Sequence, residues 1–305
     1  MNFLIQLNEH LHNMIVVINF ADDKFKQQQI DNCETAIAVG KADKVIGYRP
    51  EDIDEDFKES YKDIFAFKRG YGLWIWKAYF TLKTFDLMNE GDYLFYCDAG
   101  TYFVNDLHHL IKTMEAEDAQ IMPFELPLLE RQWTKMEAFN RIGVEDFDNN
   151  QCLAGYFLTK KSQFAIRFFT EWLNYMGELI CISPEQITDI CNSSDFIAHR
   201  EDQSVYSLLC HKYRLKIFRD PSQFGDWPWL YKKDYAVFRP VEHNNSPYPR
   251  IVVSNRRIIM RKYKRRIRNK DFLALIGVYH LLYIVKRSAR IILKGKDSKE
   301  EANKQ

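Results

Sequence analysis

The sequence YLFYCDAG at residues 93–100 decides the fold class of this chain. Its first five residues are apolar or aromatic, a run with the length and content of a buried strand, and the run stops at Asp98. A second run of this kind, MIVVINF at residues 14–20, ends before the acidic pair Asp22 and Asp23. Open α/β sheets bind ligands at the carboxyl ends of such strands. The sequence therefore predicts an α/β protein with a carboxylate at the binding edge.

Patterns elsewhere in the chain predict the remaining elements. We expect further strands at 44–48, 119–123 and 152–158, and helices at 24–33, 65–88, 107–116, 163–176 and 202–213. Residues 51–59 are expected to form an exposed loop or helix, 130–150 a substrate-facing excursion, and the aromatic, proline-broken stretch 224–231 a loop. Because strands and helices alternate, the expected architecture is a mostly parallel sheet flanked by helices.

Length and composition indicate a folded globular protein. The 305 residues are 46% hydrophobic and 28% charged, enough for one catalytic domain over 1–250 and a basic helical tail over 251–305. The six cysteines form no C-x-x-C pair, which favours a reducing compartment without structural zinc. The first twenty residues lack the features of a signal peptide, so a cytoplasmic location is expected.

The tail differs from the rest of the chain in charge. Between 256 and 296 there are 14 Lys and Arg against one acid, Asp271, a balance of +13; with a net charge of +1, the rest carries −12. A basic half precedes the apolar run 272–285, which is too short to span a bilayer but suits an interfacial helix at an anionic membrane surface. The alternatives are a helix docked on the domain itself and binding to nucleic acid, although no recognised nucleic-acid motif accompanies the charge.

Four sequence blocks together resemble a known family. They are RGYGLWIWK at 69–77, GDYLFYCDAG at 91–100, NNQCLAGYF at 149–157 and HREDQSVYSLL at 199–209. In this order they resemble the GT-A-fold glycosyltransferases of bacterial polysaccharide and lipopolysaccharide loci, within the nucleotide-diphospho-sugar transferases. The resemblance covers roughly 14–245, the span of one domain. It implies a Rossmann-like sheet and transfer of a hexose-type unit from a nucleotide-diphosphate sugar to a hydroxyl of a glycan or lipid-linked acceptor.

The resemblance also implies the donor site. Asp98 matches the first aspartate of the family's Asp-x-Asp motif, while Gly100 stands where the second would be. In the family these carboxylates hold Mn²⁺ or Mg²⁺ beside the diphosphate. Because Gly100 removes one of the two carboxylates, metal dependence is in doubt here, and Asp98 and His243 are the candidate metal ligands. Lys77 and Arg69 are the expected alternative source of positive charge.

Trp76 completes the expected donor-binding set, and Asp202, Gln203 and Gln151 are the expected catalytic residues. The resemblance places Gln151 on the acceptor side and the Asp202–Gln203 helix start beneath the transferred sugar. In an inverting enzyme Asp202 would be the general base, whereas in a retaining enzyme it would orient the sugar and stabilise positive charge. The resemblance to Asp-Gln families favours retention.

Plainer interpretations exist for each of these features. Residues 98–100 have the composition of an ordinary turn, Asp202 is a suitable helix cap, and Trp74 has the spacing of a core residue. Two rival functions follow. The glycine at position 100 is compatible with a non-catalytic binding protein of degenerate transferase fold, and the tail with a nucleic-acid binder whose affinity would depend steeply on salt.

Overall fold

The computed structural model describes residues 13–254, 260–285 and 288. The chain divides into two compact units, Met1–Arg256 and Arg257–Gln305. The named elements are β1 (Ile15–Phe20), η1 (Asp23–Phe25), α1 (Lys26–Ala38), β2 (Lys44–Tyr48), η2 (Pro50–Asp52), α2 (Glu55–Ser60), α3 (Lys62–Phe65), α4 (Gly70–Leu73), α5 (Trp76–Phe85), β3 (Tyr93–Cys97), β4 (Thr101–Phe103), α6 (His108–Ala116), β5 (Ile121–Leu129), α7 (Glu130–Trp133), α8 (Met136–Ile142), β6 (Asn150–Lys160), α9 (Gln163–Met176), α10 (Leu179–Ile182), α11 (Glu201–Lys212), α12 (Gln223–Asp226), η3 (Pro228–Tyr231), β7 (Val252–Ser254) and α13 (Met260–Leu275).

The first unit is built on a five-stranded sheet with the order β2-β1-β3-β6-β5. β1 pairs in parallel with β2 and β3, whereas β6 pairs antiparallel with β3 and β5. The expected α/β class is confirmed, but the sheet is mixed rather than mostly parallel. The antiparallel half arises because β6 follows β5 after the excursion of α7 and α8 and turns back along it.

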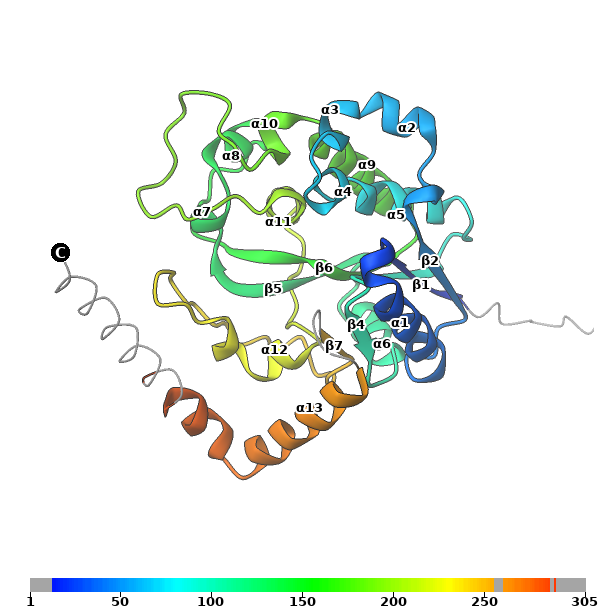
Figure 1. The fold of residues 1–305 in the computed structure, drawn as a ribbon, viewed down its shortest axis with the longest axis vertical. Coiled ribbons are helices and arrows are strands. Elements are labelled where there is room, and N and C mark those ends of the chain that lie inside the picture. The colour runs from blue at the N-terminus through cyan, green and yellow to red at the C-terminus, as the bar shows by residue number, and fades with distance from the viewer. Residues whose placement is uncertain (1–12, 255–259, 286–287, 289–305) are drawn as a thin grey trace, which may run out of the picture. The chain divides into compact units, whose positions relative to one another are not determined.

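Helices cover both faces of this sheet (Figure 1). Val16 and Ile18 of β1 belong to a core shared with residues of α5, α9 and α11, while Ile15 and Val17 point into a second core with residues of α1 and α6. This alternation is the two-residue period of a strand, and every residue of β1 is buried because both faces are covered. A small antiparallel sheet of β4 and β7 lies apart from the central one.

The helix predicted over 65–88 is interrupted. α3 ends at Phe65, α5 begins at Trp76, and the five residues between Gly70 and Trp74 all have φ between +50° and +82°. A left-handed turn costs about 1–2 kcal/mol for each residue that has a Cβ, so helical spacing of apolar residues did not reveal it. The two glycines at 70 and 72 reduce that cost, and they are the local signal for the turn.

Other elements differ in detail from the expectations. The excursion 130–150 contains the short helices α7 and α8, and the expected loop 224–231 contains α12 and η3. β4 and β7 are too short to be recognised from sequence, and since β7 pairs with β4, the first unit continues past the expected boundary at residue 250. All six cysteines are unpaired.

The second unit contains α13 and a further helical stretch over 278–285. Along these helices several large apolar side chains are exposed, namely Phe272, Leu275, Ile276, Leu281, Leu282, Ile284 and Val285. Within the described ranges, no helix combines the length and the apolar character that crossing a bilayer requires. The expectations for residues 1–12 and for much of the tail lie outside the described residues.

Candidate active site

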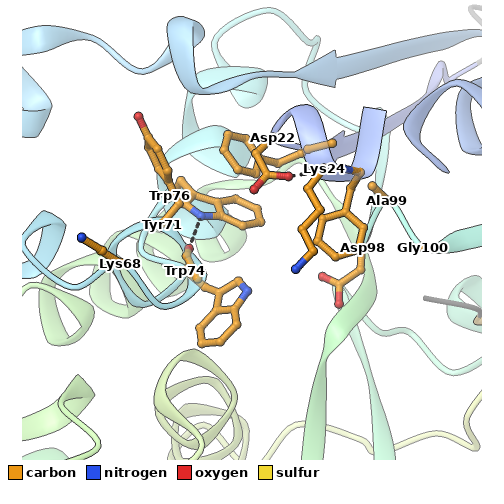
Figure 2. Close-up of a pocket in the computed structure, with 13 residues that line it drawn as sticks. Asp22, Lys24, Lys68, Tyr71, Trp74, Trp76, Asp98, Ala99 and Gly100 are labelled. Atoms are coloured by element: carbon orange, nitrogen blue, oxygen red, sulfur yellow. Dashed lines mark hydrogen bonds between the residues drawn. The ribbon is translucent and has the colours of Figure 1, made fainter. Parts of the chain in front are cut away.

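A pocket of about 340 Å³ opens at the carboxyl ends of β1 and β3. These two parallel strands are neighbours, so the residues that follow them meet at one edge of the sheet. The lining residues are Phe20, Ala21, Asp22, Lys24, Phe25, Lys68, Gly70, Tyr71, Trp74, Trp76, Asp98, Ala99 and Gly100. Figure 2 shows that the ammonium of Lys24 and the carboxylate of Asp98 point to the same side, whereas Lys68 points away from them.

The left-handed turn forms one wall of this pocket. Trp76 stacks on Phe20 with ring centroids 4.0 Å apart, and its indole Nε1 donates a hydrogen bond of 2.8 Å to the carbonyl of Gly70, drawn in Figure 2. A Cβ at Gly72 would lie only 2.8 Å from the ring of Phe65. Strained backbone persists where the surrounding packing enforces it and is concentrated at functional sites. The turn therefore supports a binding role for this wall.

A buried cluster of charges lies beside the pocket. The Lys77 Nζ atom is 2.7 Å from Asp202 Oδ2 and 3.3 Å from Asp98 Oδ1, and it donates a hydrogen bond of 3.0 Å to the carbonyl of Ala154. The side chains of Lys77 and Asp202 are 4% and 8% exposed. Tyr96 donates its hydroxyl to Asp98 Oδ1 at 2.8 Å. One ammonium thus joins a carboxylate of the pocket to a carboxylate at the start of α11.

Burial changes the acidity of this cluster. Desolvation raises the pKa of Asp202 to about 6, against the opposing effect of Lys77, and the charges of Asp98 and Glu201 raise it as well. Burial also raises the pKa of the Tyr96 hydroxyl, as does its carboxylate neighbour Asp98. Asp202 is therefore mainly ionised at neutral pH but gains a proton in mild acid, a property frequent in functional carboxylates.

Arg69 connects the left-handed turn to α11. Its Nε atom is 2.7 Å from Glu201 Oε1, and its guanidinium lies over the ring of Trp74 at 5.4 Å. Glu201 has φ +41°, an unusual conformation for a residue with a Cβ, and burial raises its pKa while Arg69 lowers it. The ion pair holds the pocket wall against the helix that carries Asp202.

The predicted residues Gln151 and Gln203 contact each other. Gln203 Nε2 donates a hydrogen bond of 2.9 Å to Gln151 Oε1, and Gln151 is fully buried on β6. Neither residue lines the pocket; they lie on the elements that carry Ala154 and Asp202. Of the nine residues predicted from sequence, three line the pocket: Trp76, Asp98 and Gly100.

His243 occupies a different environment. Its Nε2 atom is 3.0 Å from Glu125 Oε2 on β5. In the part of the chain that the structure describes, no three His, Cys, Asp or Glu side chains are grouped so that they could hold a metal ion. Asp98 is the one carboxylate among residues 98–100, and its Oδ1 atom already faces Tyr96 and Lys77. Mg²⁺ at nucleotide sites is held by one or two carboxylates together with phosphate oxygens and waters. The carboxylates that line this pocket are Asp98 and Asp22, so without the second aspartate of the Asp-x-Asp motif a cation here would depend mainly on phosphate oxygens and water.

Several pocket residues were not identified from sequence. Lys24, Phe25 and Tyr71 line the pocket, and Tyr96 supports Asp98 from within β3. Lys24 lies in the segment that follows β1, four residues after Phe20, so the rule that ligands bind where strands end could have found it. Nothing in the sequence marks Tyr96, which looks like any other residue of an apolar strand.

No protein-family profile and no curated protein matches this sequence. Among solved structures, the chain is similar to the apo form of mouse xyloside xylosyltransferase 1, with 9% identity and a TM-score of 0.40 over 80% of this chain and 97% of that one. It is similar to the galactosyltransferase LgtC in complex with donor and acceptor sugar analogues, with 15% identity and a TM-score of 0.41 over 79% and 86%. It is also similar to the apo glycosyltransferase GlyE of Streptococcus pneumoniae TIGR4, with 15% identity and a TM-score of 0.38 over 80% and 54%.

Proposed function

We propose that this protein is a glycosyltransferase that moves a hexose-type unit from a nucleotide-diphosphate sugar to a hydroxyl of a glycan or lipid-linked acceptor. The observation that carries the proposal is the contact of Lys77 with both Asp98 and Asp202. Three sequence blocks that are far apart in the chain, and that resemble the transferase motifs, thereby meet in a buried cluster beside the pocket. A role in bacterial surface polysaccharide synthesis is part of the proposal and follows from the sequence resemblance alone.

The pocket has the chemistry that a nucleotide needs. Aromatic side chains such as Tyr71 and Trp74 supply flat apolar surface for a base, and the exposed Lys24 supplies positive charge for phosphate oxygens. Asp98 lies between this pocket and the buried cluster, where it is suited to hold a ribose or sugar hydroxyl. In this arrangement Lys77 acts indirectly, because its charge is shared by two carboxylates and it does not line the pocket.

In the proposed reaction the bond between the sugar carbon C1 and the diphosphate oxygen breaks. A bond from C1 to the acceptor oxygen forms, and the acceptor proton leaves to a base or to the departing diphosphate. Positive charge develops on the sugar ring as the first bond breaks, and fixed negative groups stabilise it. Asp202 fits this electrostatic role better than that of a general base, because Lys77 and burial restrict its reach. This favours retention of configuration.

The test is a panel of nucleotide sugars with the purified protein, with and without Mn²⁺ or EDTA, alongside Asp98→Ala. Turnover of one donor that depends on Asp98 would support the proposal. Turnover that persists in EDTA would assign charge neutralisation to protein cations, in agreement with the ligand set around Asp98. If no donor binds or is turned over, the non-catalytic alternative that Gly100 suggests replaces this proposal.

We further propose that the second unit attaches the enzyme to the inner face of an anionic membrane, where a lipid-linked acceptor would be found. Its helices expose large apolar residues such as Phe272 and Leu275 close to the exposed cations Arg265, Arg266 and Arg268. Sedimentation with vesicles containing anionic lipid tests this. Binding that weakens with salt and with Phe272→Ser/Leu275→Ser is expected; equal binding to neutral vesicles, or none, would contradict it.

A further inference from the structure

Glu130 is a fully buried carboxylate outside the pocket, at the start of α7. The hydroxyls of Thr134 and Ser207 donate to it, the Nε2 atom of Gln151 donates at 3.1 Å, and the Nε2 atom of His211 lies 3.6 Å away. Every one of these neighbours presents a donor. Glu130 therefore acts as an acceptor for the side-chain donors of Thr134, Ser207 and Gln151.

This carboxylate determines which way the Gln151 amide faces. Besides Glu130, the Gln151 Nε2 atom lies 3.1 Å from Thr134 Oγ1 and 3.3 Å from the carbonyl of Trp133. A reversed amide would place its carbonyl against a carboxylate and a backbone carbonyl, so that buried acceptors would face one another with no donor between them. The nitrogen of Gln151 must therefore face Glu130, and its carbonyl must face Gln203.

The orientation of Gln203 follows from that of Gln151. Since the carbonyl of Gln151 can only accept, Gln203 must offer its Nε2 atom, which it does at 2.9 Å. Its own carbonyl oxygen then points away from Gln151, and within the described part of the chain it accepts no hydrogen bond. Gln203 is partly exposed and directly follows Asp202.

His211 adds positive charge next to Glu130. Burial by itself would lower the pKa of His211, but Glu130 at 3.6 Å, the neighbouring Cys152 and the hydrogen bond of Nε2 to the carbonyl of Asn150 raise that pKa to about 9.

We propose that Glu130 is a positioning residue that acts through Gln151 to hold the carbonyl oxygen of Gln203 toward the substrate. This inference rests on the proposed function. In the proposed reaction the carbonyl oxygen of Gln203, next to Asp202, stabilises the positive charge that develops on the transferred sugar. Glu130 itself does not line the pocket, so its effect on the reaction passes through the two glutamines.

A double-mutant cycle of stability measurements tests the chain of hydrogen bonds from Glu130 through Gln151 to Gln203, called the relay below, without reference to activity. Gln203→Glu places a carboxylate against the fixed carbonyl of Gln151, so it should lower the midpoint of urea unfolding. In a Glu130→Gln background Gln151 is able to reverse, and the same change should lower the midpoint much less. If Glu130→Gln does not fold, a Gln151→Met background serves the same purpose, because it removes the opposing carbonyl.

The control is Glu171→Gln on α9, whose carboxylate pairs with Lys212 at the surface. Combined with Gln203→Glu, it should give a purely additive loss, since the two sites share no hydrogen bond. An additive result for Glu130→Gln as well would overturn the relay.

Kinetics test whether the relay serves the reaction. Glu130→Gln should lower kcat about tenfold or more and leave KM for the donor nearly unchanged, with partial recovery in Glu130→Asp. If Glu130→Gln and Gln203→Glu have non-additive effects on stability but Glu130→Gln leaves kcat unchanged, the positioning role is refuted. Absence of turnover by the wild-type protein would refute the proposed function, and the relay would then be decided by the stability cycle alone.

Discussion

Replacing Lys77 by methionine should expose the electrostatics on which this site depends. The ammonium lies 2.7 Å from Asp202 and 3.3 Å from Asp98, and methionine fills much of its volume without its charge. Removing one partner of a buried ion pair leaves an uncompensated charge, and typically costs about 3–5 kcal/mol of unfolding free energy. We expect a loss of this size at about pH 8, where Asp202 of the wild-type protein is ionised.

The loss should also depend on pH. In the wild-type protein the folded-state pKa of Asp202, about 6, lies above the unfolded value, so its contribution to stability declines as pH rises to about 6 and is level above. Without Lys77 the folded-state pKa of Asp202 rises further, so the variant continues to lose about 1.4 kcal/mol of unfolding free energy per pH unit above about pH 6. The cost of Lys77→Met should therefore grow by about 2–3 kcal/mol between about pH 6 and pH 8.

Urea unfolding followed by tryptophan fluorescence at the two pH values measures this cost. Lys83→Met is the matched control, because Lys83 lies on the same helix but pairs with the exposed Asp54 at 3.0 Å. An exposed pair is worth about 0–1 kcal/mol, so the control should lose little at either pH. A cost for Lys77→Met below about 1 kcal/mol, or one that is equal at both pH values, would refute the reasoning.

Three further predictions concern the reaction, the turn and the metal. Asp202→Asn should lower the transfer rate by about 10²-fold or more, and the wild-type rate should fall as pH decreases through about 6, where Asp202 gains a proton; a pH–rate profile that is flat across this range would contradict it. Gly72→Ala should cost at least about 1 kcal/mol more than Gly143→Ala in thermal unfolding, because both glycines have φ +82° but only Gly72 would set a Cβ 2.8 Å from Phe65; equal losses would count against it. Donor binding measured by calorimetry should be insensitive to EDTA in the wild-type protein and should gain Mn²⁺ dependence in Gly100→Asp, and a wild-type protein that loses its donor in EDTA would show that metal ligands were missed.

The elements that could be predicted from sequence are those whose signal is local. The strands at 44–48 and 93–97 and the helix at 163–176 have the predicted bounds, because an apolar run or an amphipathic period is a property of neighbouring residues. The left-handed turn at 70–74 could not be predicted in this way. Its conformation is held by Trp76 against Phe20 and by Arg69 against Glu201, contacts that only the folded chain provides.

The same division applies to the candidate site. The sequence by itself determined that Asp98 would stand at the carboxyl end of a buried strand, because the run before it and the turn after it are adjacent in the chain. Only the tertiary structure decided that Lys77 serves two carboxylates, that His243 pairs with Glu125, and that Lys24 enters the pocket. Charge interactions and desolvation depend on distances between distant segments, and those distances exist only after the helices pack on the sheet.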